Sequence, residues 1–390
     1  MSLYYPTAQP TIAPNIMVRK TRRLPVAGDI VVRIGARVSA DDIVARATMP
    51  STPQQVPVAG PLGVQPKAGV RFLSRPVGAA IMEGDTLAQR RQGLSKKLLV
   101  RSPVAGTLTA YDPVNGSATV TPNGTQFELT ANIDGVVTEH IPYRGVVIDT
   151  PAALVRGIVG VGGEGHGVLQ VAVTGPDEEL TAEGISARLA YAIVLGGGTT
   201  TAAALQRAVE HNVRAVIVGS IPEAELRAFL GYSEGLAGWE LGRRGWEFPP
   251  PVVSAQPVAR PPLTLIVVEG FGRGPMTSKA WELLASFDGQ EVSVDGTTQL
   301  RNGLRRPEII VPLARAAGTA PYETTAPAPS VRALVRLIAP PYLGQTGRIT
   351  ALSSGKQSLP SGLSALAAEV ALAGGGAPVW VPLTNLEVLE

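Results

Sequence analysis

The sequence predicts a multidomain α+β protein with β-rich regions at both ends and an α/β domain between them. Three observations favour this class. The chain has 390 residues, more than one ordinary hydrophobic core accommodates, so we expect about two to four domains. Its 44 Gly and 34 Pro separate short Val, Ile and Leu runs, which is typical of sheets with brief connections. Between residues 191 and 218 the apolar period changes from that of a strand to that of a helix and back.

Composition excludes several classes of function. The chain contains no cysteine, which rules out disulfides, zinc thiolate sites and cysteine nucleophiles, and its net charge is +3. The first twenty residues hold three prolines and no continuous apolar segment, so they do not resemble a signal peptide. No run approaches the roughly 18 apolar residues of a membrane helix. We therefore expect a cytoplasmic protein with no membrane span.

The N-terminal part is expected to contain an extended arm at 1–20 and a β domain at 21–125. Each copy of a recurring Pro-Val-Ala-Gly phrase leads into short apolar runs separated by glycine turns, which predicts strands of four or five residues. The copies stand at unequal spacing, at 25–28, 57–60 and 103–106. Residues 126–175 continue the pattern and are expected to be a β connection or extension.

The order of turns and strands in this region matches a known pattern. From Gly28 to Leu62 a Gly-Asp turn, two strands and a Pro-Val-Ala-Gly turn follow one another, and the order returns between Glu83 and Gly106. It resembles the biotinyl/lipoyl-like barrel-sandwich hybrid domain, which also occurs as a non-carrier version in the A subunit of the sodium-translocating NADH:quinone reductase. The resemblance implies a fold more than an activity.

Carrier domains of that family hold biotin or lipoate on a lysine at an exposed hairpin tip. The tip would lie here at Met49-Pro50-Ser51, and no lysine occurs between Lys20 and Lys67. In the second unit Lys96 and Lys97 lie near the family's position but lack its neighbouring residues, and a solvated turn is the alternative. We therefore predict no bound cofactor.

Residues 176–315 are expected to form an α/β domain with a partly parallel sheet. The periodicity predicts, in chain order, strand 191–195, helix 199–211, strand 214–218, helix 223–229, strand 263–268 and helix 277–287. A strand, a helix and a second strand in immediate succession form a βαβ unit, which implies parallel strands and a right-handed crossover.

The last part of the chain returns to a β pattern. A linker rich in Ala, Pro and Thr at 316–330 precedes short strands with glycine turns, and residues 331–390 are expected to form an SH3-like β-barrel. Within it, the stretch from Pro341 to Ile349 resembles the KOW motif of transcription and ribosomal proteins. The resemblance implies a module that binds RNA or protein.

Two glycine-rich loops follow strands of the predicted α/β domain. The first opens a helix, where backbone amides, hydroxyls and the helix dipole can hold a phosphate or carboxylate. Because open α/β sheets bind ligands at the carboxyl ends of their strands, both loops are expected to line one crevice. The candidate residues for a small anionic ligand are Gly196, Gly197, Gly198, Thr199, Thr200, Glu269, Gly270, Gly272 and Arg273. Alternatively, Thr199 or Thr200 caps the helix, and Glu269 and Arg273 form an ion pair.

A third loop, Gly160 to Gly167, exposes successive glycine amides but matches no phosphate-binding fingerprint. A bulged hairpin is the structural alternative. Glu164 and His166 in this loop could form an acid/base pair or half of a metal site. The chain has only three histidines, so we predict that Glu164 and His166 are solvated side chains at the surface and not metal ligands.

The sequence shows no Ser-His-Asp grouping, nucleophile elbow or paired carboxylates, and we name no catalytic residue. Three functions are open. The first is a non-catalytic binding or scaffold protein that docks on a protein partner. The second is an enzyme or sensor for a nucleotide-like ligand. The third is RNA binding through the C-terminal barrel, with candidate contacts Arg332, Arg336, Arg348 and Lys356.

Overall fold

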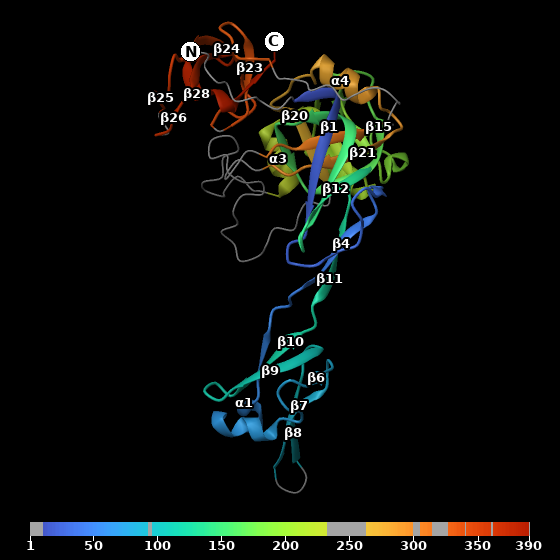
Figure 1. Cartoon of the computed structure of the whole chain (residues 1–390), viewed down its shortest axis with the longest axis vertical. Helices are drawn as coiled ribbons and strands as arrows, with labels where there is room; N and C mark the ends of the chain where they lie inside the picture. The colour runs from blue at the N-terminus through green and yellow to red at the C-terminus, as the bar shows by residue number, and fades with distance from the viewer. Residues whose placement is uncertain are drawn as a thin grey trace.

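The computed structural model describes residues 11–92, 96–231, 263–298, 305–313, 327–339, 341–359 and 362–389. Within these residues the protein is β-rich, with mixed sheets and short helices, as the sequence predicts. No helix of the described part is long and apolar enough to cross a bilayer. The molecule is elongated, with a large body at one end and a small module at the other (Figure 1).

A mixed sheet forms the frame of the body. Its strands, in spatial order, are β14 (Val159–Val161), β20 (Thr264–Phe271), β19 (Ala215–Ile221), β17 (Ile193–Leu195), β15 (Glu164–Val171), β21 (Glu291–Asp295), β22 (Glu308–Pro312), β13 (Gly145–Arg156), β12 (Gly135–Ile141) and β3 (Arg37–Val38). Strand β1 (Ile12–Arg23) pairs with β13 in antiparallel register, so residues 12–20 of the expected N-terminal arm belong to this sheet, whereas residues 1–10 lie outside the described ones.

The strands β15, β17, β19 and β20 run parallel, and both of their faces are covered. In β19, Val216 and Val218 enter one core, whereas Ala215 and Ile217 enter the other. This alternation follows from the two-residue repeat of a strand, and burial on both faces explains the unbroken apolar run. The predicted βαβ unit and its parallel pairing are confirmed.

Helices α2 and α3 pack on one face of these strands, and α4 packs on the other. The helices are α2 (Ala202–Glu210), α3 (Glu223–Leu230) and α4 (Ser278–Ala285), with a 3-10 turn η2 at Ala187–Leu189. Each of the three predicted helices is therefore present, with ends that differ by a few residues from the expected ones. Pro222 precedes the first turn of α3, where a missing N–H costs nothing.

The N-terminal β region splits into two parts with separate cores. One part belongs to the body, where β2 (Asp29–Ile30), β4 (Ile43–Met49) and β11 (Thr125–Thr130) form a three-stranded sheet. Buried residues of β4, including Val44 and Ala45, pack with Ile148 of β13 and Ile310 of β22. The boundary expected at 125/126 therefore falls at the start of β11, which pairs with β4 along its length.

The other part, residues 54–122, is inserted between β4 and β11, and we call it the distal module (Figure 1). Its elements are β5 (Gln54–Pro57), α1 (Ala59–Leu62), η1 (Pro66–Phe72), β6 (Ala80–Ile81), β7 (Thr86–Gln92), β8 (Lys96–Arg101), β9 (Gly106–Asp112) and β10 (Ser117–Pro122). Its core, which includes Leu62, Leu87 and Leu108, contains no residue of the body.

Two short connections join the distal module to the body. Met49 at the end of β4 pairs with Thr125, and Gln54 at the start of β5 pairs with Val120, so the chain enters and leaves at one place. The Ser51 hydroxyl donates to the Asn123 carbonyl across the two connections at 2.9 Å. Met49-Pro50-Ser51, expected as a hairpin tip, is therefore a connection, because the chain continues into β5 instead of turning back.

The C-terminal region is a five-stranded antiparallel sheet in the order β28-β27-β24-β23-β29. Its elements are β23 (Leu334–Leu337), β24 (Thr346–Leu352), β25 (Gln357–Ser358), β26 (Ser364–Ala365), β27 (Ala367–Leu372), β28 (Val379–Pro382), η3 (Leu383–Asn385) and β29 (Leu386–Val388). Ile338 and Leu343 reach into the α/β core. Residues 316–326, most of the expected linker at 316–330, lie outside the described residues.

Candidate functional site

The loop expected to cradle an anion is closed by backbone. Gly196, Gly197, Gly198, Thr199 and Thr200 are all buried. The Gly196 amide donates to the Ile217 carbonyl and the Gly198 amide to the Glu178 carbonyl, each at 2.8 Å. A Cβ on Gly197 would stand 2.4 Å from the Gly175 oxygen. These glycines are therefore required by close backbone packing, and the paired amides have no donor left for an anion.

The segment that fills the loop is a short strand, β16 (Glu179–Leu180). It pairs in parallel with β18 (Thr199–Thr200), and the Thr200 hydroxyl donates to the Leu180 carbonyl at 3.0 Å. Thr201 caps α2 by accepting from the Ala204 amide at 3.2 Å. The capping alternative is thus the observed one, although the cap is Thr201 and not Thr199 or Thr200.

The N-terminus of α2 is also occupied. The Glu225 carboxylate of α3 accepts from the Ala202 amide at 2.8 Å. A carboxylate at this position compensates the positive end of the helix dipole and satisfies an amide that an external anion would otherwise bind. The protein therefore supplies its own anion at the predicted ligand position.

The second predicted loop does lie beside the first. Ser220 joins them, because its hydroxyl bonds to the Gly198 carbonyl at 2.8 Å and accepts from the Gly274 amide at 2.9 Å. The structure therefore brings the two loops together at one edge of the sheet. Arg273 is exposed and lies 3.8 Å from Glu179, while Gly272 has positive φ with open space around it.

Glu269 does not pair with Arg273. Its carboxylate forms a buried ion pair with Arg336 of the C-terminal sheet and accepts from the Thr277 amide at 2.9 Å, next to α4. Gly270 has a φ of +121°, and a Cβ there would stand 2.9 Å from the Gly344 Cα. Glu269 and Gly270 therefore fasten the C-terminal sheet to the α/β core and do not face a ligand.

The C-terminal arginines differ in their availability. Arg336 is only 4% exposed, between Glu269 and Glu387, so it is not available as a nucleic-acid contact. Glu387 also holds Arg306 at 3.2 Å, where burial lowers the pKa of the guanidinium and Glu387 opposes that shift. The other three candidates, Arg332, Arg348 and Lys356, are exposed, and Arg348 donates to the Arg332 carbonyl at 3.0 Å.

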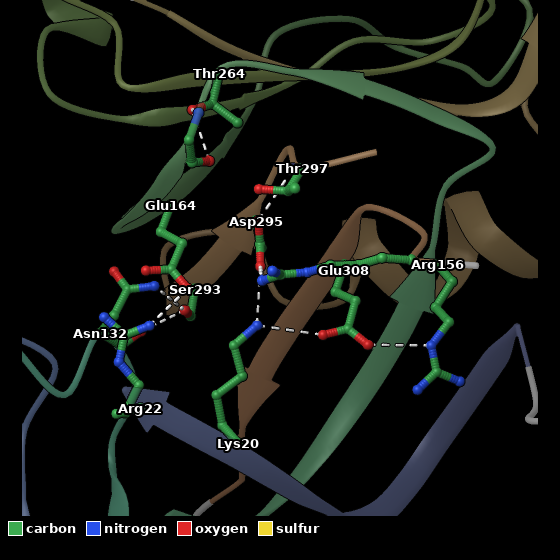
Figure 2. A network of polar contacts seen from close by, with 12 residues as sticks. Lys20, Arg22, Asn132, Arg156, Glu164, Thr264, Ser293, Asp295, Thr297 and Glu308 are labelled. Atoms are coloured by element: carbon green, nitrogen blue, oxygen red, sulfur yellow. Dashed lines mark hydrogen bonds and ion pairs between the residues drawn. The ribbon is translucent and has the colours of Figure 1, made fainter. Parts of the chain in front are cut away.

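The loop at Gly160 to Gly167 is not a hairpin. β14 pairs with β20, whereas β15 pairs with β17 and β21, so the two strands separate at Gly162, whose φ is +94°. Glu164 pairs with the buried Arg22 at 2.6 Å, as Figure 2 shows. It thus neutralises a buried cation and is not free as an acid or base.

His166 lies near Glu164 but has different partners. Its Nε2 is 2.9 Å from an Asp41 carboxylate oxygen, and its Nδ1 is 3.4 Å from the Asn132 side-chain oxygen. Asn132 in turn contacts the buried Ser293, which donates to the Asn132 carbonyl. In the described part of the chain, acidic and histidine side chains form no group of three that could hold a metal ion.

A charged network that the sequence did not reveal links β1 to β21 and β22 (Figure 2). Lys20 Nζ lies 3.1 Å from Asp295 and 3.4 Å from Glu308, and Glu308 also pairs with Arg156 at 3.2 Å. Asp295 is 3% exposed and pairs with Arg305 as well. The available signal was weak, because Asp295 and Glu308 stand at the ends of short apolar strands and Lys20 is one of four basic residues in β1.

Opposing influences act on the Asp295 carboxyl. Burial, the largest of them, raises its pKa, but Lys20, two hydrogen bonds from Thr297 and the charge of Arg305 together outweigh burial and bring the pKa to about 2. Asp295 is therefore ionised at neutral pH, and its carboxylate is paired with the protein's own groups. Such an arrangement holds strands together and offers no open position for a substrate.

The distal module presents a different surface. Its strands β7 and β8 form a two-stranded ribbon at the end of the molecule, with exposed Arg91 and Lys97 directly opposite each other (Figure 1). Lys96 and Lys97, expected in a solvated turn, begin strand β8. The pairing of Lys97 with Arg91 is not visible in a single sequence. This ribbon is the candidate interaction surface.

Comparisons with known proteins do not add a function. No protein-family model matches the chain, and a search among curated proteins finds no match. The function is therefore argued from the geometry of the described residues.

Proposed function

We propose that this chain is a non-catalytic, multidomain binding protein that acts as an adaptor or subunit of a larger assembly and contacts its protein or other macromolecular partner through the distal module. The observation that carries the proposal is the position of residues 54–122. They have their own core, share no core residue with the body, and lie at the far end of the molecule (Figure 1). A separately folded projecting module is suited to contact a partner that the body does not touch.

The body supports the proposal by its closed interior. The first predicted ligand loop is filled by β16 and Glu225, Ser220 ties it to the second loop, and the polar network around Asp295 is internally paired. An interior of this kind gives the module a rigid base. The C-terminal sheet is fastened to the same base by the Glu269–Arg336 ion pair.

The test is a variant without the module. Met49 and Thr125 are paired partners at the ends of β4 and β11, so Asn-Gly can replace residues 50–124 and close a two-residue hairpin. We expect the body to keep its melting temperature, while the complex that the full chain forms in cross-linked native extracts is lost. Recovery of only the free monomer from the full chain, or an unchanged complex with the variant, would contradict the proposal.

The ligand-binding alternative has its own test, because the closed loop makes a clear prediction. A thermal-shift screen of nucleotides and phosphorylated metabolites against the full chain is expected to move the melting temperature by less than about 1 °C, since a bound ligand at 100 times its Kd would add about 2.7 kcal/mol. A rise of the melting temperature by several degrees that is absent in the Gly197→Ala variant would contradict this prediction and support a ligand site at the loop.

A further inference from the structure

Positive charge is concentrated in the distal module. Residues 54–122 contain eight Lys and Arg against three Asp and Glu, whereas the rest of the chain has 26 against 28. The net charge of +3 for the whole chain therefore conceals a strongly basic module on a slightly acidic body. Charge asymmetry of this size between parts of one chain indicates an acidic partner for the basic part.

Four of these eight cations have no partner among the residues that the structure describes. Arg75, Arg90 and Arg101 donate to backbone carbonyls of the module. By contrast, four other cations are exposed and make no side-chain hydrogen bond or ion pair with the described residues: Lys67, Arg71, Arg91 and Lys97. Folding of the module does not use these four charges.

Two of the four lie where they oppose folding. The register of the ribbon places Arg91 directly across from Lys97 and Gln89 across from Leu99, so these four side chains share one face. Ala88 and Val100, on the other face, are buried in the core of the module. Like charges directly opposite on a sheet face destabilise it. A partner with negative charge would remove that repulsion.

The remaining two cations lie on η1, the element next to the ribbon in the distal module. They are Lys67 and Arg71, and Leu73, just after η1, bridges to Ala88 of β7. Among the described side chains of the ribbon's exposed outer face, none is aromatic and Leu99 alone is large and apolar. Protein interfaces are enriched in aromatic residues and depleted of lysine, and interfacial amphipathic helices insert apolar side chains into the membrane surface. The outer face of the ribbon is therefore better suited to contact a regular array of phosphates than to contact a protein or a membrane.

We propose that the β7–β8 ribbon of the distal module binds double-stranded DNA independently of its sequence, with Arg91 and Lys97 contacting phosphates at the major groove and Lys67 and Arg71 contacting the backbone beside it. This inference rests on the proposed adaptor function and names its partner. The major groove of B-DNA is about 12 Å wide and admits a two-stranded β-ribbon. The corresponding groove of A-form RNA is too narrow for side chains, so duplex RNA should bind less tightly.

The experiment measures affinity of the full chain for a fluorescent duplex DNA of about 30 base pairs and mixed sequence. Four phosphate contacts predict that affinity falls about a hundredfold between roughly 50 and 200 mM salt. A second duplex of unrelated sequence should bind equally. The double variant Arg91→Gln/Lys97→Gln should bind about tenfold or more weakly, with a salt slope smaller by about two.

Matched controls remove the same number of charges elsewhere. Arg188 and Lys279 are exposed in the body, and Arg188→Gln/Lys279→Gln should bind DNA like the natural chain. Arg332→Gln/Lys356→Gln tests the C-terminal sheet in the same way and should also have no effect. The ribbon variant removes a like-charge pair, so its melting temperature should be unchanged or slightly higher, which separates lost binding from lost folding.

Three results would overturn the inference. They are no binding at about 50 mM salt, equal binding by the ribbon variant, and loss of binding only in the C-terminal variant. Retention on vesicles rich in phosphatidylserine without any DNA binding would also overturn it. In each case the adaptor proposal still stands or fails by the variant lacking residues 50–124, because that test scores the native complex and not DNA.

Discussion

The α/β core and the distal module differ in where their charged side chains lie and in how these side chains are paired. In the core, Asp295 and Arg336 are buried and Glu308 and Glu269 are partly buried, and each is satisfied by a partner from another strand or from the C-terminal sheet. In the distal module, Arg91 and Lys97 are exposed, lie opposite each other, and have no partner among the described residues. Paired buried charges hold a fold together, whereas unpaired exposed ones are available to another molecule. The comparison therefore separates the part that supports from the part that binds.

The two regions also differ in how their stability should be measured. The distal core and the body's cores share no residue, so a change in one should leave the other's local stability unaltered. None of the four tryptophans lies between 54 and 122, so tryptophan fluorescence follows the body alone. Hydrogen exchange measured by mass spectrometry follows both.

The largest effect is expected from Asp295→Asn. The change leaves Lys20 and Arg305 without the carboxylate that both contact, and breaking a buried pair in this way costs about 3 kcal/mol or more. Urea unfolding followed by tryptophan fluorescence should show this loss. Asp85→Asn, which removes a half-exposed carboxylate paired with Arg75 in the distal module, is the control and should not move the curve. Equal shifts for both variants would mean that the regions are coupled.

A smaller loss, about 2 kcal/mol, is expected from Gly197→Ala. The added Cβ would stand 2.4 Å from the Gly175 oxygen and 2.5 Å from the Glu178 oxygen, both backbone atoms that cannot yield without moving β16. Gly274→Ala is the matched control, because nothing lies within 4 Å of its Cβ position. The same urea titration measures both. If Gly197→Ala is as stable as Gly274→Ala, the loop is open and our account of it is wrong.

Acid should weaken the body through Asp295. Its pKa is lowered from 3.8 to about 2 in the folded protein, so the stabilisation is present above the unfolded pKa and is lost as pH falls from about 4 toward 2. A shift of this size corresponds to roughly 2 kcal/mol. As the pH falls from about 4 toward 2, the free energy of unfolding should therefore decline by roughly 2 kcal/mol more in the natural chain than in the Asp295→Asn variant. Parallel pH profiles for the two chains would refute the assignment.

The smallest effect belongs to the distal module. The Arg90 guanidinium donates to the Leu62 and Gly63 carbonyls at 2.8 and 2.7 Å, which satisfies the end of α1. Arg90→Gln should lower the stability of the distal module by about 1 kcal/mol. Amide exchange should become faster within residues 54–122 and stay unchanged in the body. Arg91→Gln, one residue away on the opposite face, should not accelerate exchange. Faster exchange throughout the chain would contradict the separation of the two regions.

Local pattern was sufficient to predict part of this fold. The βαβ unit at β17, α2 and β19 follows from apolar periodicity, since each element carries its own repeat within about ten residues. The division of residues 21–125 between two cores could not be predicted in this way. It depends on β11 pairing with β4 across the whole distal module, and repeated Pro-Val-Ala-Gly turns look alike in both parts.

The candidate sites were harder to predict, because their neighbours come from distant parts of the chain. Gly196 to Thr200 has the composition of an anion-binding turn, and only the pairing of β16 with β18 shows that it is filled. Glu269 and Arg336 lie on different domains of the sequence yet neutralise each other. Arg91 and Lys97 were visible as charges, but their direct opposition required the register of the ribbon.

The independence of the distal module is tested most directly by residues 54–122 as a separate polypeptide. The first and last strands, β5 and β10, are paired, so its ends lie together and need no support from the body. The account predicts a dispersed amide spectrum by nuclear magnetic resonance, with slow exchange for the β9 and β10 amides and cooperative thermal unfolding. A collapsed spectrum with uniformly fast exchange would show that the module depends on the body, and would contradict the division of the molecule into a supporting and a binding part.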